Sequence, residues 1–286
     1  MKTVLVTGAT GNVGFEVVQH LKTRGVKVRV AITNPEQSKR HFDPDIEVVR
    51  FIFGEPSTYL PALTGVDAVF LLRPPQISNA KKFINPFIDA AKVLGVRAMT
   101  FLSVQGAQAN PLVPHHAIEQ HLKTSGLEYS FLRAAFFMQN LTNAHHQDIL
   151  QHNDIMIPAA NGKTAFVDVR DLAAVAAITL TETGHANTAY ELTGSQALTY
   201  DQVAQILSQI LGRTIRYSHP NVLQFWQRRY QYQEPIGFIL VMTALYTVAA
   251  LGQAGHLTTD TKRLLGREPI TFEQFARDHA SAWLPA

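Results

Sequence analysis

Residues 4–14 of the chain read Val-Leu-Val-Thr-Gly-Ala-Thr-Gly-Asn-Val-Gly, a short β-rich run followed by three evenly spaced glycines. Beyond it Val13, Val17 and Leu21 recur at helical spacing, and Gly25 marks the expected end of that helix. A strand, a glycine turn and a helix in this order let the backbone approach a pyrophosphate, whose charge is met by amides at the helix N-terminus. The stretch predicts the opening of a dinucleotide-binding α/β fold.

Five further apolar runs follow, separated by segments of helical periodicity. We expect strands at residues 28–32, 46–51, 67–72, 98–103 and 129–133. Pro74 and Pro75 end the fourth strand, and Pro86 indicates either a kink in the next helix or a helix start capped by Asn85. Strand–helix alternation produces crossover connections, so the predicted fold class is α/β, a Rossmann-type doubly wound parallel sheet.

The pattern changes after about residue 157, and we expect a Rossmann lobe over 1–157 and a smaller, interleaved C-terminal α/β substrate lobe over 158–286. In the second half we expect strands at 165–169 and 189–192, a helix capped by Asp171, and capping pairs Thr199–Gln202 and Thr271–Gln274. Residues 219–256 show little periodicity and many aromatic side chains, which we interpret as core, lid or pocket lining. The apolar run 236–251 is expected to be buried or to line a pocket.

Composition excludes several classes of protein. Of 286 residues 46% are hydrophobic and 16% charged, which excludes disorder for most of the chain. The absence of cysteine excludes disulfides, Cys-ligated zinc and thiol catalysis. A net charge of +3 without a basic run argues against direct nucleic-acid binding, and the longest apolar run is shorter than the roughly 20 residues of a membrane span. The chain opens directly into a strand, so we expect no targeting segment and a cytoplasmic protein.

Five stretches, in chain order, carry a family resemblance. They are Thr-Gly-Ala-Thr-Gly-Asn-Val-Gly at 7–14, Phe-Leu-Ser-Val-Gln-Gly at 101–106, Phe-Leu-Arg-Ala-Ala-Phe-Phe-Met-Gln-Asn at 131–140, Val-Asp-Val-Arg-Asp at 167–171 and Tyr-Glu-Leu-Thr-Gly at 190–194. With them the chain resembles the NmrA-like branch of the atypical short-chain dehydrogenases. Within that branch it is similar to members of the NAD(P)H quinone-reductase and triphenylmethane-reductase type.

The resemblance implies a Rossmann lobe that holds NADP(H), with the C-terminal lobe closing over the nicotinamide. It assigns the pyrophosphate to Gly8, Thr10, Gly11, Asn12 and Val13, and the adenine-side ribose to Leu72 and Arg73. It assigns the nicotinamide ribose to Ser103 and Val104, and the nicotinamide ring to Ala135, Phe136 and Phe137. Thr33 and Ile52 depart from the family, because relatives often carry Arg and Asp at these places.

The residues after the second strand bear on the choice of cofactor. Positions 32–35 read Ile-Thr-Asn-Pro, without the acid that often holds the ribose hydroxyls of NAD. Asn34 is expected near this ribose, and Lys39 with Arg40 could meet a 2′-phosphate; alternatively both charges are simply solvated. We therefore expect NADP(H) in preference to NAD(H).

The helix after the fifth strand lacks the Tyr-x-x-x-Lys pair of ordinary short-chain dehydrogenases, which argues against carbonyl-to-alcohol reduction. Residues 114–121 read Pro-His-His-Ala-Ile-Glu-Gln-His instead. His115, expected to titrate near neutral pH, is the first candidate for assisting catalysis, with His116 second and Ser103 as a further hydrogen-bonding group. Alternatively the histidines cap the helix or face solvent, and Glu119 pairs with His115 or Lys123.

Other clusters have simpler interpretations. His145, His146 and His152 lack the spacing of a metal site, so no metal is expected. Asp168 and Asp171 are explained by a strand end and a helix cap. The sequence predicts an NADPH-dependent oxidoreductase that transfers a hydride to a small quinone-like or dye-like aromatic acceptor. The alternative is an NADP(H)-binding redox sensor without turnover, which would act through a protein partner.

Overall fold

The computed structural model describes residues 1–284, without the side chains of residues 37–39. The chain folds into two compact units, which share it in alternation. The first unit holds residues 1–134, 169–192 and 263–266, and the second holds residues 135–168, 193–262 and 267–286. The boundary expected after residue 157 thus falls within a segment of the second unit.

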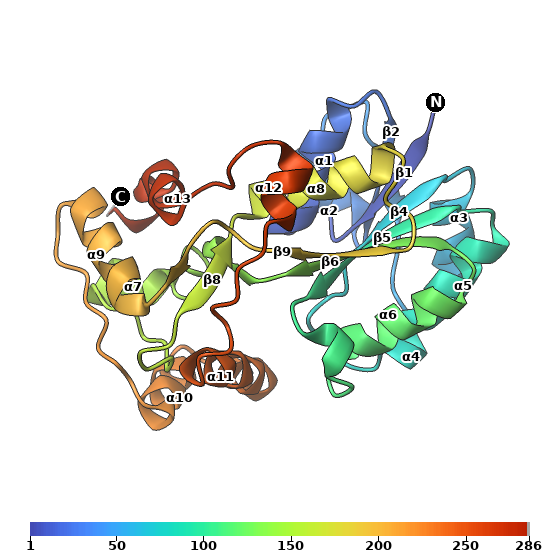
Figure 1. Ribbon diagram of the computed structural model, residues 1–286. Helices are drawn as coiled ribbons and strands as arrows, with labels where there is room; N and C mark the ends of the chain where they lie inside the picture. The colour runs from blue at the N-terminus through green and yellow to red at the C-terminus, as the bar shows by residue number, and fades with distance from the viewer. Residues whose placement is uncertain (285–286) are drawn as a thin grey trace. The chain divides into compact units, whose positions relative to one another are not determined.

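The first unit is built on a seven-stranded sheet in which every neighbouring pair is parallel (Figure 1). Its order is β3-β2-β1-β4-β5-β6-β9. The strands are β1 (Thr3–Thr7), β2 (Lys27–Ile32), β3 (Glu47–Arg50), β4 (Ala68–Leu71), β5 (Ala98–Val104), β6 (Glu128–Ala134) and β9 (Thr188–Leu192). The order reverses between β1 and β4, the place where such sheets bind ligands beyond their carboxyl ends. The predicted Rossmann-type sheet is confirmed.

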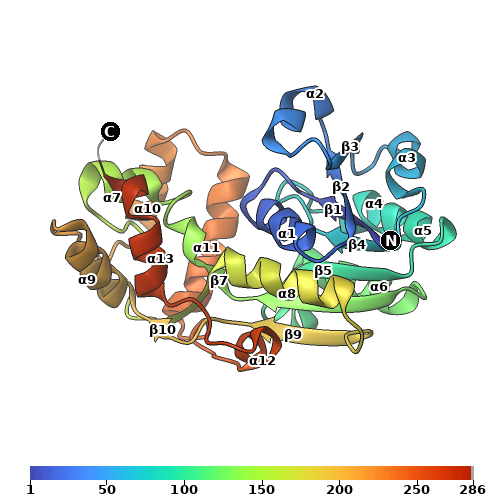
Figure 2. The same ribbon diagram turned by 90° about the horizontal axis from the view of Figure 1, so that it is seen from above.

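Helices cover both faces of this sheet (Figures 1 and 2). They are α1 (Asn12–Lys22), α2 (Pro35–Ser38), α3 (Tyr59–Leu63), α4 (Ala80–Phe83), α5 (Asn85–Val93), α6 (Pro114–Thr124) and α8 (Val169–Thr181). Helices α1 and α8 pack on one face. On the other face α3 to α6 close a core of aromatic and aliphatic side chains that includes Phe87, Phe101 and Phe131.

Two expectations about this unit are wrong at the local level. Asn85 is the first helical residue of α5 rather than its cap, and Asn79 caps the separate helix α4 by accepting a bond from Lys82 N at 3.0 Å. Helix α8 begins at Val169, so Asp171 lies inside its first turn and is not its cap. The strand expected over 189–192 is present as β9, and it pairs with β6 in the first sheet.

The second unit has a small sheet and a helical shell. Strand β8 (Thr164–Val167) lies between β10 (Ala197–Leu198), which is antiparallel to it, and β7 (Phe136–Phe137), which is parallel. The helices are α7 (His146–His152), α9 (Tyr200–Leu211), α10 (Val222–Gln231), α11 (Ile236–Ala250), α12 (Asp260–Leu265, whose last residues belong to the first unit) and α13 (Phe272–Asp278). Thr199 and Gln202 form the predicted capping box of α9.

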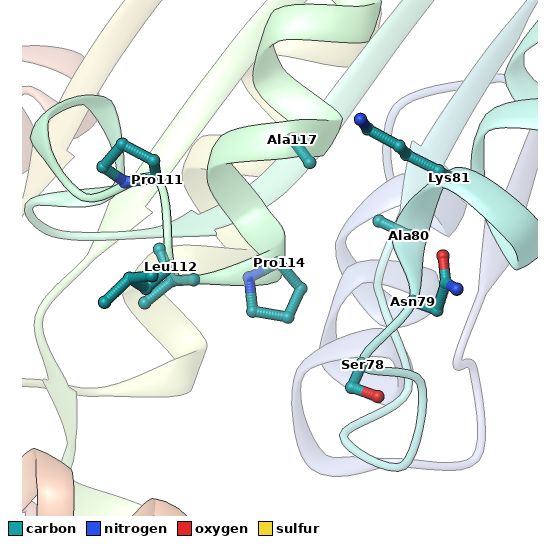
Figure 3. Close-up of a pocket in the computed structure, with 9 residues that line it drawn as sticks. Ser78, Asn79, Ala80, Lys81, Pro111, Leu112, Pro114 and Ala117 are labelled. Carbon is teal, nitrogen blue, oxygen red and sulfur yellow. The ribbon is translucent and has the colours of Figure 1, made fainter.

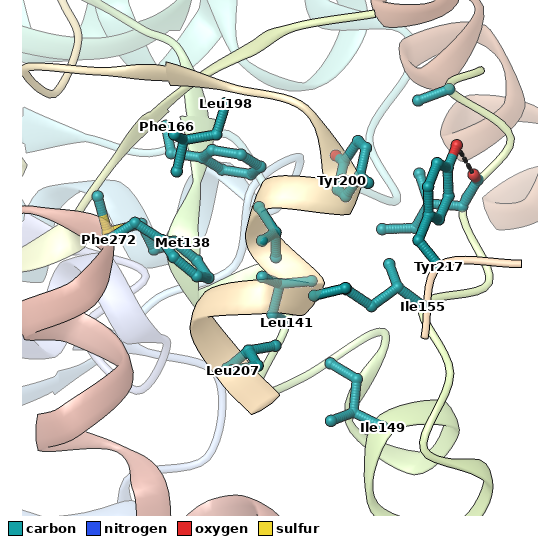
Figure 4. Close-up of a cluster of buried hydrophobic side chains, with 14 of the residues drawn as sticks. Met138, Leu141, Ile149, Ile155, Phe166, Leu198, Tyr200, Leu207, Tyr217 and Phe272 are labelled. Carbon is teal, nitrogen blue, oxygen red and sulfur yellow. Dashed lines mark hydrogen bonds between the residues drawn. The ribbon is translucent and has the colours of Figure 1, made fainter. Parts of the chain in front are cut away.

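Figure 4 shows the core of this unit, in which Tyr200 and Phe272 both lie against Phe166. The Tyr217 hydroxyl reaches the same core and donates a hydrogen bond to the carbonyl of Ile157 at 2.9 Å. Burial of the polar hydroxyl is tolerated because its hydrogen bond is satisfied within the unit.

Residues 219–256 form two regular helices rather than an irregular segment. Helix α10 starts at a capping box made by Asn221 and Gln224. Helix α11 buries Ile239, Met242, Tyr246 and Ala249 along one face, whereas Ile236 on the other side is 56% exposed. The apolar run is therefore not buried throughout. Of the helices in residues 1–284, none combines the length and the apolarity that crossing a bilayer would need.

Candidate active site

The glycine turn after β1 adopts a conformation that its sequence requires. Gly8 has a φ of +66°, and its carbonyl accepts a hydrogen bond from Gly11 N at 3.0 Å just before α1 begins. A Cβ at Gly14 would lie 2.2 Å from the Gly8 oxygen, so only glycine lets the helix approach the turn this closely. The first turn of α1 carries no acidic side chain, and Gly11 offers it no side-chain cap. These features fit an anionic pyrophosphate held by backbone amides.

Thr7 joins the carboxyl ends of β1 and β4 at the point where the strand order reverses. Its hydroxyl donates to Phe70 O at 3.0 Å and accepts from Leu72 N at 2.8 Å. Leu72 in turn lies against the turn, because a Cβ at Gly8 would be 3.0 Å from its Cδ2 atom. The structure therefore brings Gly8 and Leu72 together.

Most of the predicted cofactor residues lie at one edge of the sheet. Those that follow β1, β2 and β4 or end β5 are Gly8, Thr10, Gly11, Asn12, Val13, Asn34, Leu72, Arg73, Ser103 and Val104. They share this edge because the carboxyl ends of parallel strands point the same way. Ala135, Phe136 and Phe137 belong to the second unit, and the side chain of Lys39 lies outside the described residues.

The buried carboxylate of Glu119 links three elements of the first unit. Glu119 on α6 is fully buried; it accepts from Ser103 Oγ at 2.6 Å and from the Arg133 guanidinium at 3.1 and 2.7 Å. The expected pairing of Glu119 with His115 or Lys123 is therefore wrong. The Ser103 hydroxyl is held in place because it donates its hydrogen to Glu119. Its oxygen can therefore still accept a hydrogen bond from another group. A signal did exist: Glu119 adjoins the apolar stripe of Ile118 and Leu122.

His115 lies at the start of α6, with its ring stacked on Phe101 of β5 at a centroid distance of 5.9 Å. Burial, aided by the nearby charge of Arg73, lowers the pKa of His115 to about 3. The imidazole is thus neutral near pH 7, and the expectation that it titrates there is wrong. It can offer a neutral N–H to a hydrogen-bond acceptor but cannot serve as a cationic acid. His116 is held separately, with Nδ1 2.8 Å from Ala107 O.

A hollow opens beside these residues between the loops that follow β4 and β5 (Figure 3). It has a volume of about 360 Å³. One wall is formed by residues 78–81 and the other by residues 111–114 with Ala117. Pro114, at the start of α6, lies in this wall next to His115 in the chain. The hollow offers space for a small molecule on the first unit.

His145 and His146 serve the packing of the second unit, whereas His152, the last residue of α7, is exposed. His145 is fully buried and contacts the Tyr246 hydroxyl through Nε2, and burial lowers its pKa well below the usual range. His146 Nε2 lies 2.6 Å from Ala282 O. Within residues 1–284, no three histidine, aspartate or glutamate side chains are grouped so that they could hold a metal ion.

Comparisons with known proteins agree with this geometry. The model of the NmrA-like family matches residues 1–275. The chain belongs to the NmrA-like family. It is 32% identical over 286 residues to an NAD(P)H azoreductase of Xenophilus azovorans, covering 98% of this chain and 99% of the relative.

Two solved structures share both the fold and part of the sequence of this NmrA-like protein. The triphenylmethane reductase of Citrobacter sp., complexed with NADP(H), has a TM-score of 0.85 and 26% identity, over 96% of this chain and 99% of that one. An NADPH-dependent quinone oxidoreductase of Escherichia coli, complexed with NADPH, has a TM-score of 0.87 and 26% identity, over 97% and 99%. The predicted family resemblance is confirmed.

Proposed function

We propose that this NmrA-like protein is an NADPH-dependent oxidoreductase that transfers a hydride to a quinone-like or dye-like conjugated acceptor. The main support for this proposal is the glycine turn, which packs closely against the start of α1. The turn lies where the strand order of the sheet reverses, and its backbone amides can there bind a pyrophosphate. The names of the relatives support the acceptor class, since they are an azoreductase, a quinone oxidoreductase and a triphenylmethane reductase. We expect the protein to act in the cytoplasm.

NADPH, when bound, would supply the hydride. The residues of this chain would hold the cofactor and the acceptor in place and would provide polar groups around the acceptor. Gly8, Thr10, Gly11, Asn12 and Val13 would hold the pyrophosphate through the turn and the amides of α1. Ser103, anchored by Glu119, keeps the end of β5 in register with α6. His115 offers a neutral N–H toward charge that develops on the acceptor. The final proton comes from water, since a conjugated acceptor yields a delocalised product that needs no dedicated acid.

The test is NADPH oxidation by the purified protein against a panel of quinones, azo dyes and triphenylmethane dyes, with cofactor binding titrated in parallel. Turnover with any of these acceptors supports the proposal. Tight NADPH binding without turnover across the panel contradicts it and favours a redox sensor, because the chain lacks the Tyr–Lys pair of ordinary short-chain dehydrogenases.

Reversing two charges after β2 tests the 2′-phosphate contact. Lys39→Glu combined with Arg40→Glu is expected to weaken NADPH binding by about tenfold or more while NADH binding changes little, because only NADPH carries the extra phosphate. Fluorescence titration measures both affinities. The control, Lys92→Glu with Lys123→Glu, reverses two exposed charges on α5 and α6. Unchanged NADPH affinity in the test variant would show that this contact is not made.

Replacing His115 tests its neutral state. Because the pKa of His115 in the folded protein is about 3, its ring stays neutral above about pH 4. His115→Gln should therefore lower turnover without changing the shape of the rate-against-pH profile between about pH 5 and 9. The unfolded state takes up the proton first, at about pH 6.5, so the wild type loses stability relative to His115→Gln as the pH falls below that value. Rate profiles and urea titrations measure both effects. An inflection near pH 6.5 that the variant abolishes would contradict this assignment.

A further inference from the structure

Arg73 is a partly buried arginine without a carboxylate partner in the described part of the first unit. Two arginines of the same unit show the usual arrangement: Arg29 pairs with Glu47 at 2.9 Å, and Arg133 pairs with Glu119 at 2.7 Å. For Arg73 no carboxylate of the described residues lies within the 4.0 Å that defines an ion pair. A guanidinium removed from water without a counter-charge is unfavourable, so its position favours a negatively charged ligand.

Backbone hydrogen bonds hold the Arg73 side chain in one orientation. Its Nη1 atom donates to the carbonyls of Pro74, Pro75 and Ile77 at 2.9, 3.3 and 2.7 Å. Its Nε atom is buried without a hydrogen-bond partner, and Nη2 has no acceptor among the described residues. The loop therefore uses one nitrogen to fix the guanidinium and leaves the other donors for a ligand.

The sheet register brings His115 to the same place. Leu71 of β4 lies opposite Phe101 of β5, Arg73 follows Leu71 by two residues, and the His115 ring stacks on Phe101. The Arg73 charge also contributes to the lowered pKa of His115, as expected for neighbouring groups. The His115 ring has no polar partner among the described residues. A fixed positive charge and a neutral ring N–H thus converge beyond the ends of β4 and β5.

We propose that Arg73, to which the family resemblance assigned the adenine-side ribose, instead acts with His115 to bind the oxygen atom on which negative charge develops during reduction. The site then favours neutral acceptors that become oxyanions, such as quinones, over dyes that are already cationic. This inference rests on the proposed function. A hydride brings two electrons and one proton to a quinone, which leaves a hydroquinone monoanion; its oxygen takes one proton from water after release from Arg73. A cationic acceptor would lose charge instead and would be repelled by the guanidinium before the reaction.

The experiment compares two acceptors in Arg73→Met, which keeps most of the side-chain volume and removes the charge. We expect kcat/KM for a neutral naphthoquinone to fall by about 10- to 100-fold. For a cationic triphenylmethane dye we expect no loss or a gain, with the NADPH affinity within about twofold of the wild type. Arg97→Met, on an exposed arginine of the same unit, is the control and should change neither acceptor. Arg73→Lys should recover part of the quinone activity.

A binding measurement separates this inference from the proposed function. Binding of 4-nitrophenolate to the NADP⁺-loaded protein, followed by absorbance, should weaken in Arg73→Met, whereas binding of neutral 4-nitroanisole should not. If the wild type turns over no acceptor, the proposed function fails, and phenolate binding still decides whether the anion site exists. The inference would be overturned if Arg73→Met lowered kcat/KM equally for both acceptors and left phenolate binding unchanged. Arg73 would then only hold the loop after β4 in its conformation. Loss of NADPH affinity by tenfold or more would assign Arg73 to a cofactor anion.

Discussion

Glu119→Ala is expected to lower the free energy of unfolding by about 3–5 kcal/mol, as for other buried ion pairs that lose one partner. The substitution leaves the Arg133 guanidinium, whose side chain is only 12% exposed, without its counter-charge. It also removes the acceptor of the Ser103 hydroxyl, which is itself buried. Urea denaturation followed by circular dichroism measures the loss.

Two further variants give this prediction its controls. Glu128→Ala removes an exposed carboxylate at the start of β6 and should change stability by less than about 0.5 kcal/mol. Combining Glu119→Leu with Arg133→Met replaces the pair with apolar side chains of similar size and should recover much of the loss. A loss below about 1 kcal/mol in Glu119→Ala would mean that water or another group readily satisfies Arg133.

Gly14→Ala is expected to weaken NADPH binding by on the order of 100-fold or more, because a few kcal/mol of binding energy depend on the shape of the turn. The new Cβ would lie 2.2 Å from the oxygen and 2.6 Å from the carbonyl carbon of Gly8. Both are backbone atoms, so the turn and α1 must move apart, and the amides that face the pyrophosphate move with them. Fluorescence titration with NADPH measures the effect, and circular dichroism checks that the helices persist.

A matched control is available in the second unit. A Cβ at Gly237 on α11 would meet no atom within 4 Å, and its backbone has no positive φ, so Gly237→Ala should leave NADPH affinity unchanged. Wild-type affinity in Gly14→Ala would contradict the placement of the pyrophosphate at this turn. The proposed cofactor site would then have to lie elsewhere on the sheet edge.

The Rossmann-type sheet and the glycine turn could be predicted from the amino-acid sequence alone. These features were predictable because they depend on local patterns: apolar runs of strand length, helical stripes between them and the spacing of Gly8, Gly11 and Gly14. Parallel strands then place Leu72 and Ser103 at the same edge without any further information. The capping box of Thr199 and Gln202 was predictable for the same reason, since its hydrogen bonds span only three residues.

Which distant residues meet, and what charge each of them carries, became clear only from the folded structure. Glu119 finds Arg133 rather than His115 because the pairing of β5 with β6 brings Arg133 opposite Ser103, beneath α6. The pKa of His115 falls below the neutral range because the folded chain buries the ring. Arg73 has no carboxylate partner among the described residues because the loop after β4 binds its guanidinium through backbone carbonyls. Strand β9 joins the first sheet because β6 offers it a free edge. Such outcomes depend on contacts between segments far apart in the chain, which local sequence patterns do not encode.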